Sequence, residues 1–161
     1  MGLLLVLAKA ESLTSKLMED ATACGNAMVK SDCNAMVAYT HPRLVELMGG
    51  KEVMIAMIKK MTKEQQAKGI GFESFSLKTP EEPKKIGKWL TAIITENIVL
   101  KVPEGTVNQE SSLLGISEDE GKSWVFIDLL HTTPELLKKI IPDLADKIVI
   151  PPKKAPVLEK K

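Results

Sequence analysis

Residues 86–117 read IGKWLTAIITENIVLKVPEGTVNQESSLLGIS. Two runs rich in β-branched and aromatic residues, 86–102 and 106–117, flank Pro103-Glu104-Gly105, and such residues favour strands. Proline and glycine in the short connection are typical of a turn. The first run is longer than most strands, so we expect a bend or bulge near Thr95–Asn97. This segment therefore predicts two antiparallel strands joined as a hairpin.

The alternation of apolar and polar residues continues on both sides of this hairpin. Upstream, Phe75 and Leu77 alternate with polar neighbours and predict a strand, which a loop at 80–83 follows. Downstream, a turn at 118–121 leads into another strand at 122–128. The pattern therefore predicts a sheet of about four strands, and connections this short make it antiparallel.

The first part of the chain has the period of helices. Apolar residues three or four positions apart predict a helix over 13–30, and Asp32 is a good N-cap for a second helix. The second helix is interrupted at His41, because a residue before proline avoids the α conformation, and restarts at Pro42. A third helix follows over 51–68.

These elements predict an α+β fold. Three N-terminal helices pack on one face of a curved antiparallel sheet, because the sheet needs a cover and the helices supply one. A short helix begins at Thr133-Pro134, and an extended, proline- and lysine-rich tail occupies 151–161. We expect one domain over 11–150.

The N-terminal residues 1–10 have two interpretations. Leu3 to Leu7 is apolar and Ala8-Lys9-Ala10 has the small residues of a cleavage site, which is typical of the end of a secretory signal. No basic residue precedes the apolar run, so the segment is either a truncated signal or an extension of the first helix. We expect a periplasmic or secreted protein, with a cytoplasmic one as the alternative.

The composition of the chain excludes several classes of partner and site. The chain has 22 Lys and Arg against 21 Asp and Glu, which gives a formal net charge of +1, and Arg43 is its single arginine. Because a nucleic-acid site needs a basic surface, we expect no nucleic-acid partner. Cys24, Cys33 and two histidines are too few for a disulfide framework or a metal site, and we expect no metal and no cofactor. No run approaches the roughly 18 apolar residues of a membrane span, so we expect no transmembrane segment.

Five short motifs between Asp20 and Val157 accompany this order of elements: AYTHP at 38–42, MGGKE at 48–52, VLKVP at 99–103, GKSWVFID at 121–128 and IVIP at 148–151. Together they resemble the cystatin-like, or nuclear transport factor 2-like, superfamily, and more closely small exported proteins of unknown function from Bacteroidetes-type bacteria. The resemblance implies a cone between helices and sheet, and an outer sheet face that is a common homodimer surface.

The wider superfamily includes ketosteroid isomerase, scytalone dehydratase and SnoaL-like polyketide cyclases, which use Asp, His or Tyr side chains inside that cone. None of their catalytic positions transfers to this chain, so the resemblance assigns no catalytic residue. A shared fold does not fix a function.

Candidate site residues each have a structural alternative. His41 could be a general base in a pocket or could satisfy a helix N-terminus, and Asp128 with His131 could be an acid–base pair or a strand-end acid beside a loop histidine. The internal methionines all lie in the helical half, where they could line an apolar pocket or fill the core. The candidate ligand-binding residues are Tyr39, His41, Met54, Met57, Trp89, Trp124 and Asp128, and none is assigned as catalytic.

Residues 117–124 read SEDEGKSW, the Asp-box pattern of sialidase propellers. A propeller needs at least four blades, and one copy is present. We therefore interpret the motif as a stabilised hairpin turn, in which Asp119 accepts hydrogen bonds from turn amides and Gly121 adopts a positive φ.

Two functions remain open at this point. The first is a non-enzymatic module that binds a small apolar ligand in the cavity or a protein partner on the sheet. The alternative is a small pocket enzyme of isomerase, dehydratase or cyclase type, with Tyr39, His41 or Asp128 as acid or base. An enzyme needs buried ionisable groups that converge in the cavity, whereas a binding module does not.

Overall fold

A computed structural model describes residues 2–161, with side chains from Ala8 onward. The first helix, α1 (Gly2–Val29), begins eleven residues before the 13–30 helix that the apolar pattern predicts. Asp20 fixes this helix to the rest of the molecule: its Oδ2 atom accepts a hydrogen bond from the buried backbone N–H of Trp124 at 3.0 Å. Gly25 lets β1 approach, because a Cβ there would lie 2.3 Å from the Phe75 ring.

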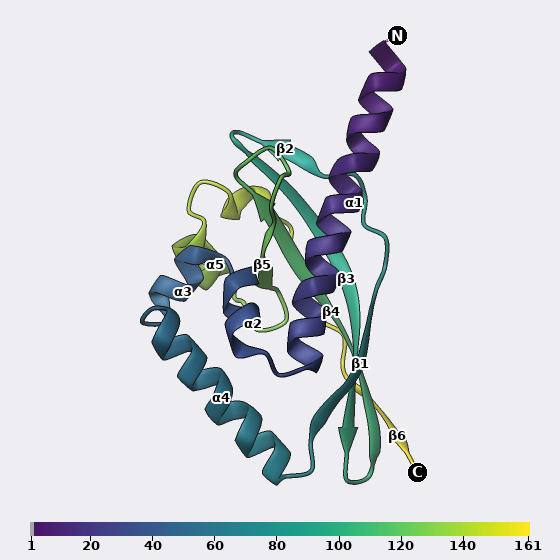
Figure 1. The fold of residues 1–161 in the computed structure, drawn as a ribbon, viewed down its shortest axis with the longest axis vertical. Helices are drawn as coiled ribbons and strands as arrows, with labels where there is room; N and C mark the ends of the chain where they lie inside the picture. The colour runs from purple at the N-terminus through teal and green to yellow at the C-terminus, as the bar shows by residue number, and fades with distance from the viewer. Residues whose placement is uncertain (1) are drawn as a thin grey trace.

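The next helices follow the predicted boundaries closely. Asp32 caps α2 (Cys33–Tyr39) by accepting a hydrogen bond from the backbone N–H of Ala35. The chain breaks at His41, which caps α3 (Pro42–Leu47). After two glycines with positive φ, α4 (Lys51–Ala67) runs diagonally across the lower part of the molecule (Figure 1). The interruption before Pro42 is therefore confirmed.

All strands belong to one antiparallel sheet with the order β1-β3-β4-β5; β2 pairs with β3, and β6 pairs with β4. The strands are β1 (Gly71–Leu77), β2 (Lys84–Ile86), β3 (Trp89–Val102), β4 (Gly105–Ser117), β5 (Val125–Asp128) and β6 (Val157–Lys160). The hairpin of β3 and β4 is its longest pairing and gives the sheet its curved spine (Figure 1).

The predicted bend near Thr95–Asn97 is wrong. β3 pairs with β4 in unbroken register from Leu90 to Val102. The long β-rich run is instead divided at Gly87, whose positive φ makes the turn between β2 and β3, and the register shift lies in β1. Thr95, Glu96 and Asn97 all pair with β4, so these polar residues do not interrupt the strand.

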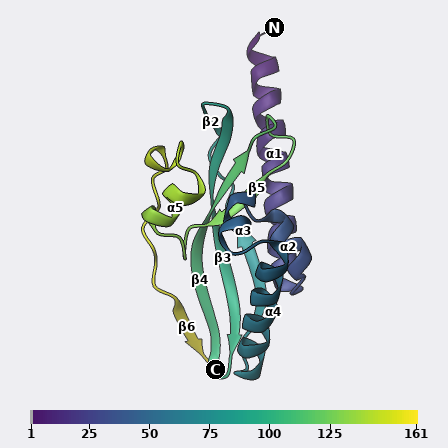
Figure 2. The ribbon, with the colours of Figure 1, turned by 90° about the vertical axis from the view of Figure 1, so that its left-hand side faces the viewer.

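Elements cover both faces of the sheet. Figure 2 shows α1, α2 and α4 on one side of β3 and β4, and α5 (Pro134–Ile140) on the other. Each side has its own buried core: Leu17, Ala21, Ile94 and Phe126 belong to the first, which also contains Trp124. The second core unites α5 and the 3-10 helix η1 (Ala145–Lys147) with the opposite face of the sheet. The face on which we expect a homodimer is thus partly covered by the chain itself.

The segment predicted as an extended tail ends as a strand. β6 pairs with Gly105–Asn108 of β4, on the edge that β5 leaves free because β5 pairs with Leu113–Ile116. The Lys154 ammonium lies 2.6 Å from Glu110 Oε1 and adds an ion pair. Prolines and lysines in the tail hid this strand from the sequence pattern, since both residue types are depleted in strands.

The interpretation of 117–124 as a stabilised turn is confirmed. Asp119 accepts hydrogen bonds from the Ser123 backbone N–H at 2.9 Å and from the Ser117 hydroxyl at 2.8 Å. Gly121 has a φ of +87°. The hydrogen bond from the Ser123 hydroxyl is the main reason that the pKa of Asp119 falls to about 2.

We expect Asp119→Ala to lower the free energy of unfolding by about 1–2 kcal/mol, because hydrogen bonds to a charged acceptor are lost. The native-state pKa lies below the unfolded value, so the contribution of Asp119 is present above about pH 4 and disappears as the pH falls toward 2. Chemical denaturation between pH 2 and 7 measures both effects. Lys122→Ala, exposed in the same turn, is the control, and equal losses in both variants would contradict the role of Asp119.

Candidate functional site

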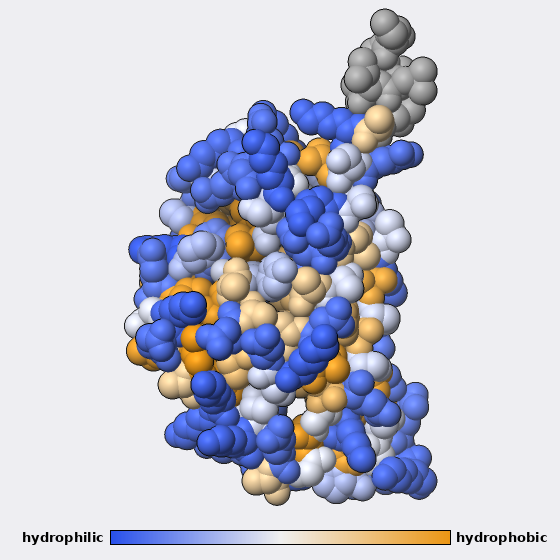
Figure 3. Space-filling model, viewed as in Figure 1, coloured by the Kyte–Doolittle hydropathy of each residue, from blue (hydrophilic) through white to orange (hydrophobic). Residues whose placement is uncertain are grey.

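A cavity of about 280 Å³ lies between the helices α1, α2 and α4 and the strands β3, β4 and β5. We call it the helix-side cavity. Figure 3 shows this side of the molecule: apolar surface gathers in its middle, between the helices, with hydrophilic residues around it. The cavity wall is largely apolar and includes Met28, Met36, Met54, Ile58, Leu113 and Phe126.

The pairing of α2 with the sheet positions one wall of this cavity. Thr40 forms a parallel bridge with Phe126, and the His41 backbone N–H donates a hydrogen bond to the Phe126 carbonyl at 3.0 Å. These contacts hold the end of α2 against β5, so Tyr39 and Asp128 line the same cavity.

Glu96 is the unusual residue of the cavity. Its position on β3 places it between Ile94 and Ile98 on the helix-facing side of the sheet, and it is 4% exposed. Burial, with the nearby charge of Asp128 as a second cause, raises the pKa of Glu96 to about 7. The carboxyl group therefore changes protonation state near neutral pH, as an acid–base group does.

A chain of polar groups leads from Glu96 toward the surface. Ser111 is opposite Glu96 in the β3–β4 register, and its hydroxyl donates a hydrogen bond to Asp128 Oδ1 at 3.2 Å. The same oxygen accepts a hydrogen bond from the Leu130 backbone N–H at 2.8 Å. Asp128 Oδ2 lies 2.6 Å from Nδ1 of the exposed His131. Glu96, Ser111, Asp128 and His131 thus form a polar line from the cavity to solvent.

The structure brings three of the predicted site residues together. Tyr39, Met54 and Asp128 line the helix-side cavity. Met57, on α4, is 38% exposed and lies outside the lining, and Trp124 is 2% exposed within the helix-side core.

Trp89 and His41 also lie outside the cavity lining. Trp89 packs against the core on the opposite face of the sheet and donates its indole N–H to Glu118 Oε1 at 3.1 Å. His41 is buried, and its Nδ1 atom accepts a hydrogen bond from the Arg43 backbone N–H at 3.2 Å. Desolvation lowers the pKa of His41, so the ring is the neutral cap of α3 rather than part of the polar line.

Sequence reasoning missed Glu96 and Ser111. The available signal was an acid within the apolar run of β3, in alternation with Ile94, which is buried, and Ile98, which is partly buried. The expected bend near Thr95–Asn97 rests on the length of the run and takes no account of this acid. A buried carboxyl with apolar neighbours on its own face is instead a functional-site signal.

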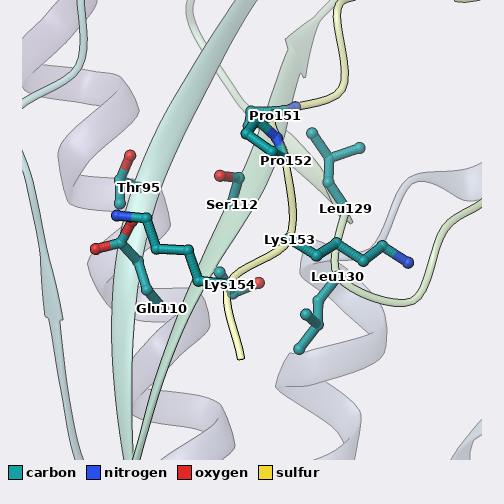
Figure 4. Close-up of a pocket in the computed structure, with 10 residues that line it drawn as sticks. Thr95, Glu110, Ser112, Leu129, Leu130, Pro151, Pro152, Lys153 and Lys154 are labelled. Atoms are coloured by element: carbon teal, nitrogen blue, oxygen red, sulfur yellow. The ribbon is translucent and has the colours of Figure 1, made fainter. Parts of the chain in front are cut away.

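Other hollows lie on the opposite face of the sheet. A cavity of about 130 Å³ lies under the C-terminal segment, where Figure 4 shows Lys154 extending toward Glu110 and Thr95. A larger one, about 510 Å³, adjoins the loop after β1, and its Lys78 forms an ion pair with Glu110 at 3.2 Å. Lys154 and Lys78 are both paired with Glu110. A larger volume alone therefore does not make either hollow a better candidate site than the helix-side cavity.

The described part of the chain offers neither a cluster of metal ligands nor a membrane-spanning helix. Residues 2–161 contain no group of three or more His, Cys, Asp or Glu side chains able to hold a metal ion. Over the same range, no helix has the length and apolar character needed to cross a membrane. Cys24 and Cys33 are free thiols, and burial raises the pKa of Cys24 to about 12, so this cavity residue is neutral at pH 7.

Comparison with known proteins adds little to this geometry. No family model matches the chain, and no curated protein matches it. A solved structure described as "Structure of an M.tuberculosis LEH-like epoxide hydrolase" is similar over 83% of this chain and 95% of that chain, with 12% identity and a TM-score of 0.37. A likeness at this level carries no argument about activity. The α+β architecture rests on the elements described above, and the superfamily resemblance stays a prediction.

Proposed function

We propose that the protein binds a small, mainly apolar molecule in the helix-side cavity, with the polar part of that molecule at Glu96 and Asp128. The observation that carries this proposal is a largely apolar cavity with two carboxyl groups among its lining residues. Ligand sites commonly combine an apolar wall with few, well-placed polar groups. The volume of about 280 Å³ favours a ligand smaller than most drugs, for which pockets of roughly 300–1,000 Å³ are usual.

The methionines support the same function. Met28, Met36 and Met54 reach the cavity from three different helices. Unbranched, polarisable methionine side chains adapt to ligands of different shapes. A wall of this kind suits an apolar body better than a sugar or a nucleotide, which need many fixed hydrogen-bond partners.

We expect Met54→Trp to weaken binding of the neutral fluorescent probe N-phenyl-1-naphthylamine by roughly tenfold or more, because the larger side chain occupies the cavity. Loss of about 1.4 kcal/mol of binding free energy corresponds to tenfold in the dissociation constant. Fluorescence titration measures the affinity. Met57→Trp is the matched control, since Met57 is on the same helix and outside the lining.

Two results would count against the binding function. One is the absence of saturable probe fluorescence in the unmodified protein. The other is an equal effect of the two tryptophan substitutions, which would place the probe on the outer surface of α4. A folded Met54→Trp variant, shown by an unchanged circular dichroism spectrum, is needed for the comparison.

A second candidate function is proton transfer on the bound molecule, and the polar line from Glu96 to His131 favours it. Glu96 would exchange a proton with the ligand, and Ser111 and Asp128 would connect it to the exposed His131. Tyr39 is an additional hydrogen-bond donor at the cavity. Of the acid–base residues considered from sequence, this proposal retains Tyr39 and Asp128 and replaces His41 with Glu96.

Deuterium exchange tests the proton-transfer function. Wild-type protein in D₂O should accelerate exchange of the α-hydrogens of a small apolar ketone, observed by NMR, and Glu96→Gln should abolish the acceleration. Equal exchange with both proteins would remove this candidate and leave the binding function unaffected, since binding does not require a proton to move.

A further inference from the structure

We propose that the polar part of the ligand is an amine: an ammonium group held at the carboxyl groups of Glu96 and Asp128, on an apolar body. This inference rests on the proposed binding function and specifies its ligand class. It follows from the charges at the cavity, from the hydrogen-bond capacity of the two acids and from the apolar wall.

The first argument is charge. The ionisable side chains of the lining are Cys24 from α1, Tyr39 from α2, Glu96 from β3 and Asp128 from β5. All are acids, so each is neutral or negative, and the lining drawn from residues 2–161 contains no Lys, Arg or His. His131, the basic group in contact with Asp128, is itself exposed and lies outside the lining. An anionic ligand would be repelled, whereas an ammonium group would be the missing counter-charge.

The second argument is hydrogen bonding. The Ser111 hydroxyl lies between the two acids but has one proton, and it donates that proton to Asp128 Oδ1. Ser111 is also the one side-chain donor of the described residues that acts on Glu96, where it lowers the pKa against the larger effect of burial, although Glu96 is 4% exposed and lines the cavity. A buried carboxylate that shares one donor with a second acid is costly. An ammonium group has three donors and satisfies Glu96 while reaching the free lone pair of Asp128.

The third argument is the apolar wall, which determines that the part of the ligand beyond the amine is apolar. Met28, Met36, Leu113 and Phe126 surround the space beyond the acids. An amine with a short chain and one ring uses this wall, whereas a polyamine would place a second charge against it without a partner.

Three probes with the same body test the inference: 4-phenylbutylamine, 4-phenylbutan-1-ol and 4-phenylbutyrate. Calorimetric titration at pH 7.5 should give roughly tenfold or higher affinity for the amine than for the alcohol, since a hydrogen bond to a charged group contributes about 1.5–3 kcal/mol. The acid should bind weakest. Competition with N-phenyl-1-naphthylamine locates all three in the helix-side cavity.

Glu96→Gln should reduce amine affinity roughly tenfold and leave alcohol affinity nearly unchanged. Glu73→Gln is the control, because Glu73 is exposed on β1 and its loss changes the net charge equally. The pH dependence is a separate test on the unmodified protein. The ammonium group binds to ionised Glu96, whose pKa in the free protein is about 7, so amine affinity should rise between pH 6 and 8 and then level off.

The outcomes separate this inference from the function on which it rests. Alcohol affinity equal to or above that of the amine, with both displaced by the fluorescent probe, would overturn the amine site and leave the apolar binding function in place. Amine affinity that is independent of pH, or equally reduced by Glu73→Gln, would also overturn it. Failure of all three probes and of the fluorescent probe to bind would remove both.

Discussion

Glu96→Gln is expected to stabilise the protein more at pH 8 than at pH 4.5. The effect of the substitution on the free energy of unfolding should differ by about 3 kcal/mol between the two pH values. The pKa of Glu96 rises from 4.5 to about 7 on folding, mainly because the carboxyl group is buried. Each pKa unit corresponds to about 1.4 kcal/mol. Glutamine keeps the shape and remains neutral, so it does not carry the cost of a buried charge at high pH.

The direction of the pH effect follows from proton linkage. Below pH 4.5 the glutamic acid is protonated in both states, and its contribution to stability is fully present. Between pH 4.5 and about 7 the unfolded chain releases the proton while the folded chain retains it, so this stability is lost as the pH rises. Above pH 7 both states are ionised and the difference is constant.

Denaturant unfolding of wild type and variant at pH 4.5, 6 and 8 measures this difference. Glu110→Gln is the control: Glu110 is on the adjacent strand, and its pKa is lowered, first by Lys154 and then by Lys78. That substitution should bring no gain at pH 8. Parallel stability curves for wild type and Glu96→Gln would show that Glu96 is solvated in the folded state and that the acid–base reading of the cavity is wrong.

The order of helices and strands could be predicted because local rules determine it. The helix break at His41, the hairpin turn at 103–105 and the start of α5 after Thr133 each depend on a proline, a glycine or a capping side chain nearby. The start of α1 follows one of the two interpretations of residues 1–10, an extension of the first helix, whereas the strand β6 could not be predicted in this way. β6 depends on the free edge of β4, a feature of the assembled sheet rather than of residues 157–160.

The candidate site was harder to predict, because core and cavity wall have the same sequence pattern. Leu17, Ala21, Cys24 and Met28 form one apolar stripe of α1. The first two are fully buried in the core, whereas the last two line the helix-side cavity. The helical period is the same for both pairs, so it does not show which part of the stripe meets the core and which part meets a cavity.

Leu17→Ala is expected to lower the free energy of unfolding by about 2–5 kcal/mol. Leu17 is 0% exposed. A Cβ added to Gly115 would lie 2.9 Å from Leu17 Cδ1, so the Leu17 side chain rests directly on the backbone of β4. Truncation leaves a space that the rigid sheet cannot close. Leu47→Ala, at a leucine that is 41% exposed, should cost under about 1 kcal/mol.

The glycine provides the decisive test of this contact. Gly115→Ala alone should destabilise by about 1–3 kcal/mol, because the new methyl group meets the Leu17 side chain. In the Leu17→Ala background the same substitution should cost at least about 1 kcal/mol less, since the clashing atom is absent and only Phe126 at 3.3 Å and Trp124 at 3.4 Å remain close. A double-mutant cycle by denaturant unfolding measures the coupling. Additive effects would mean that the Leu17 side chain of α1 does not rest on β4 at Gly115.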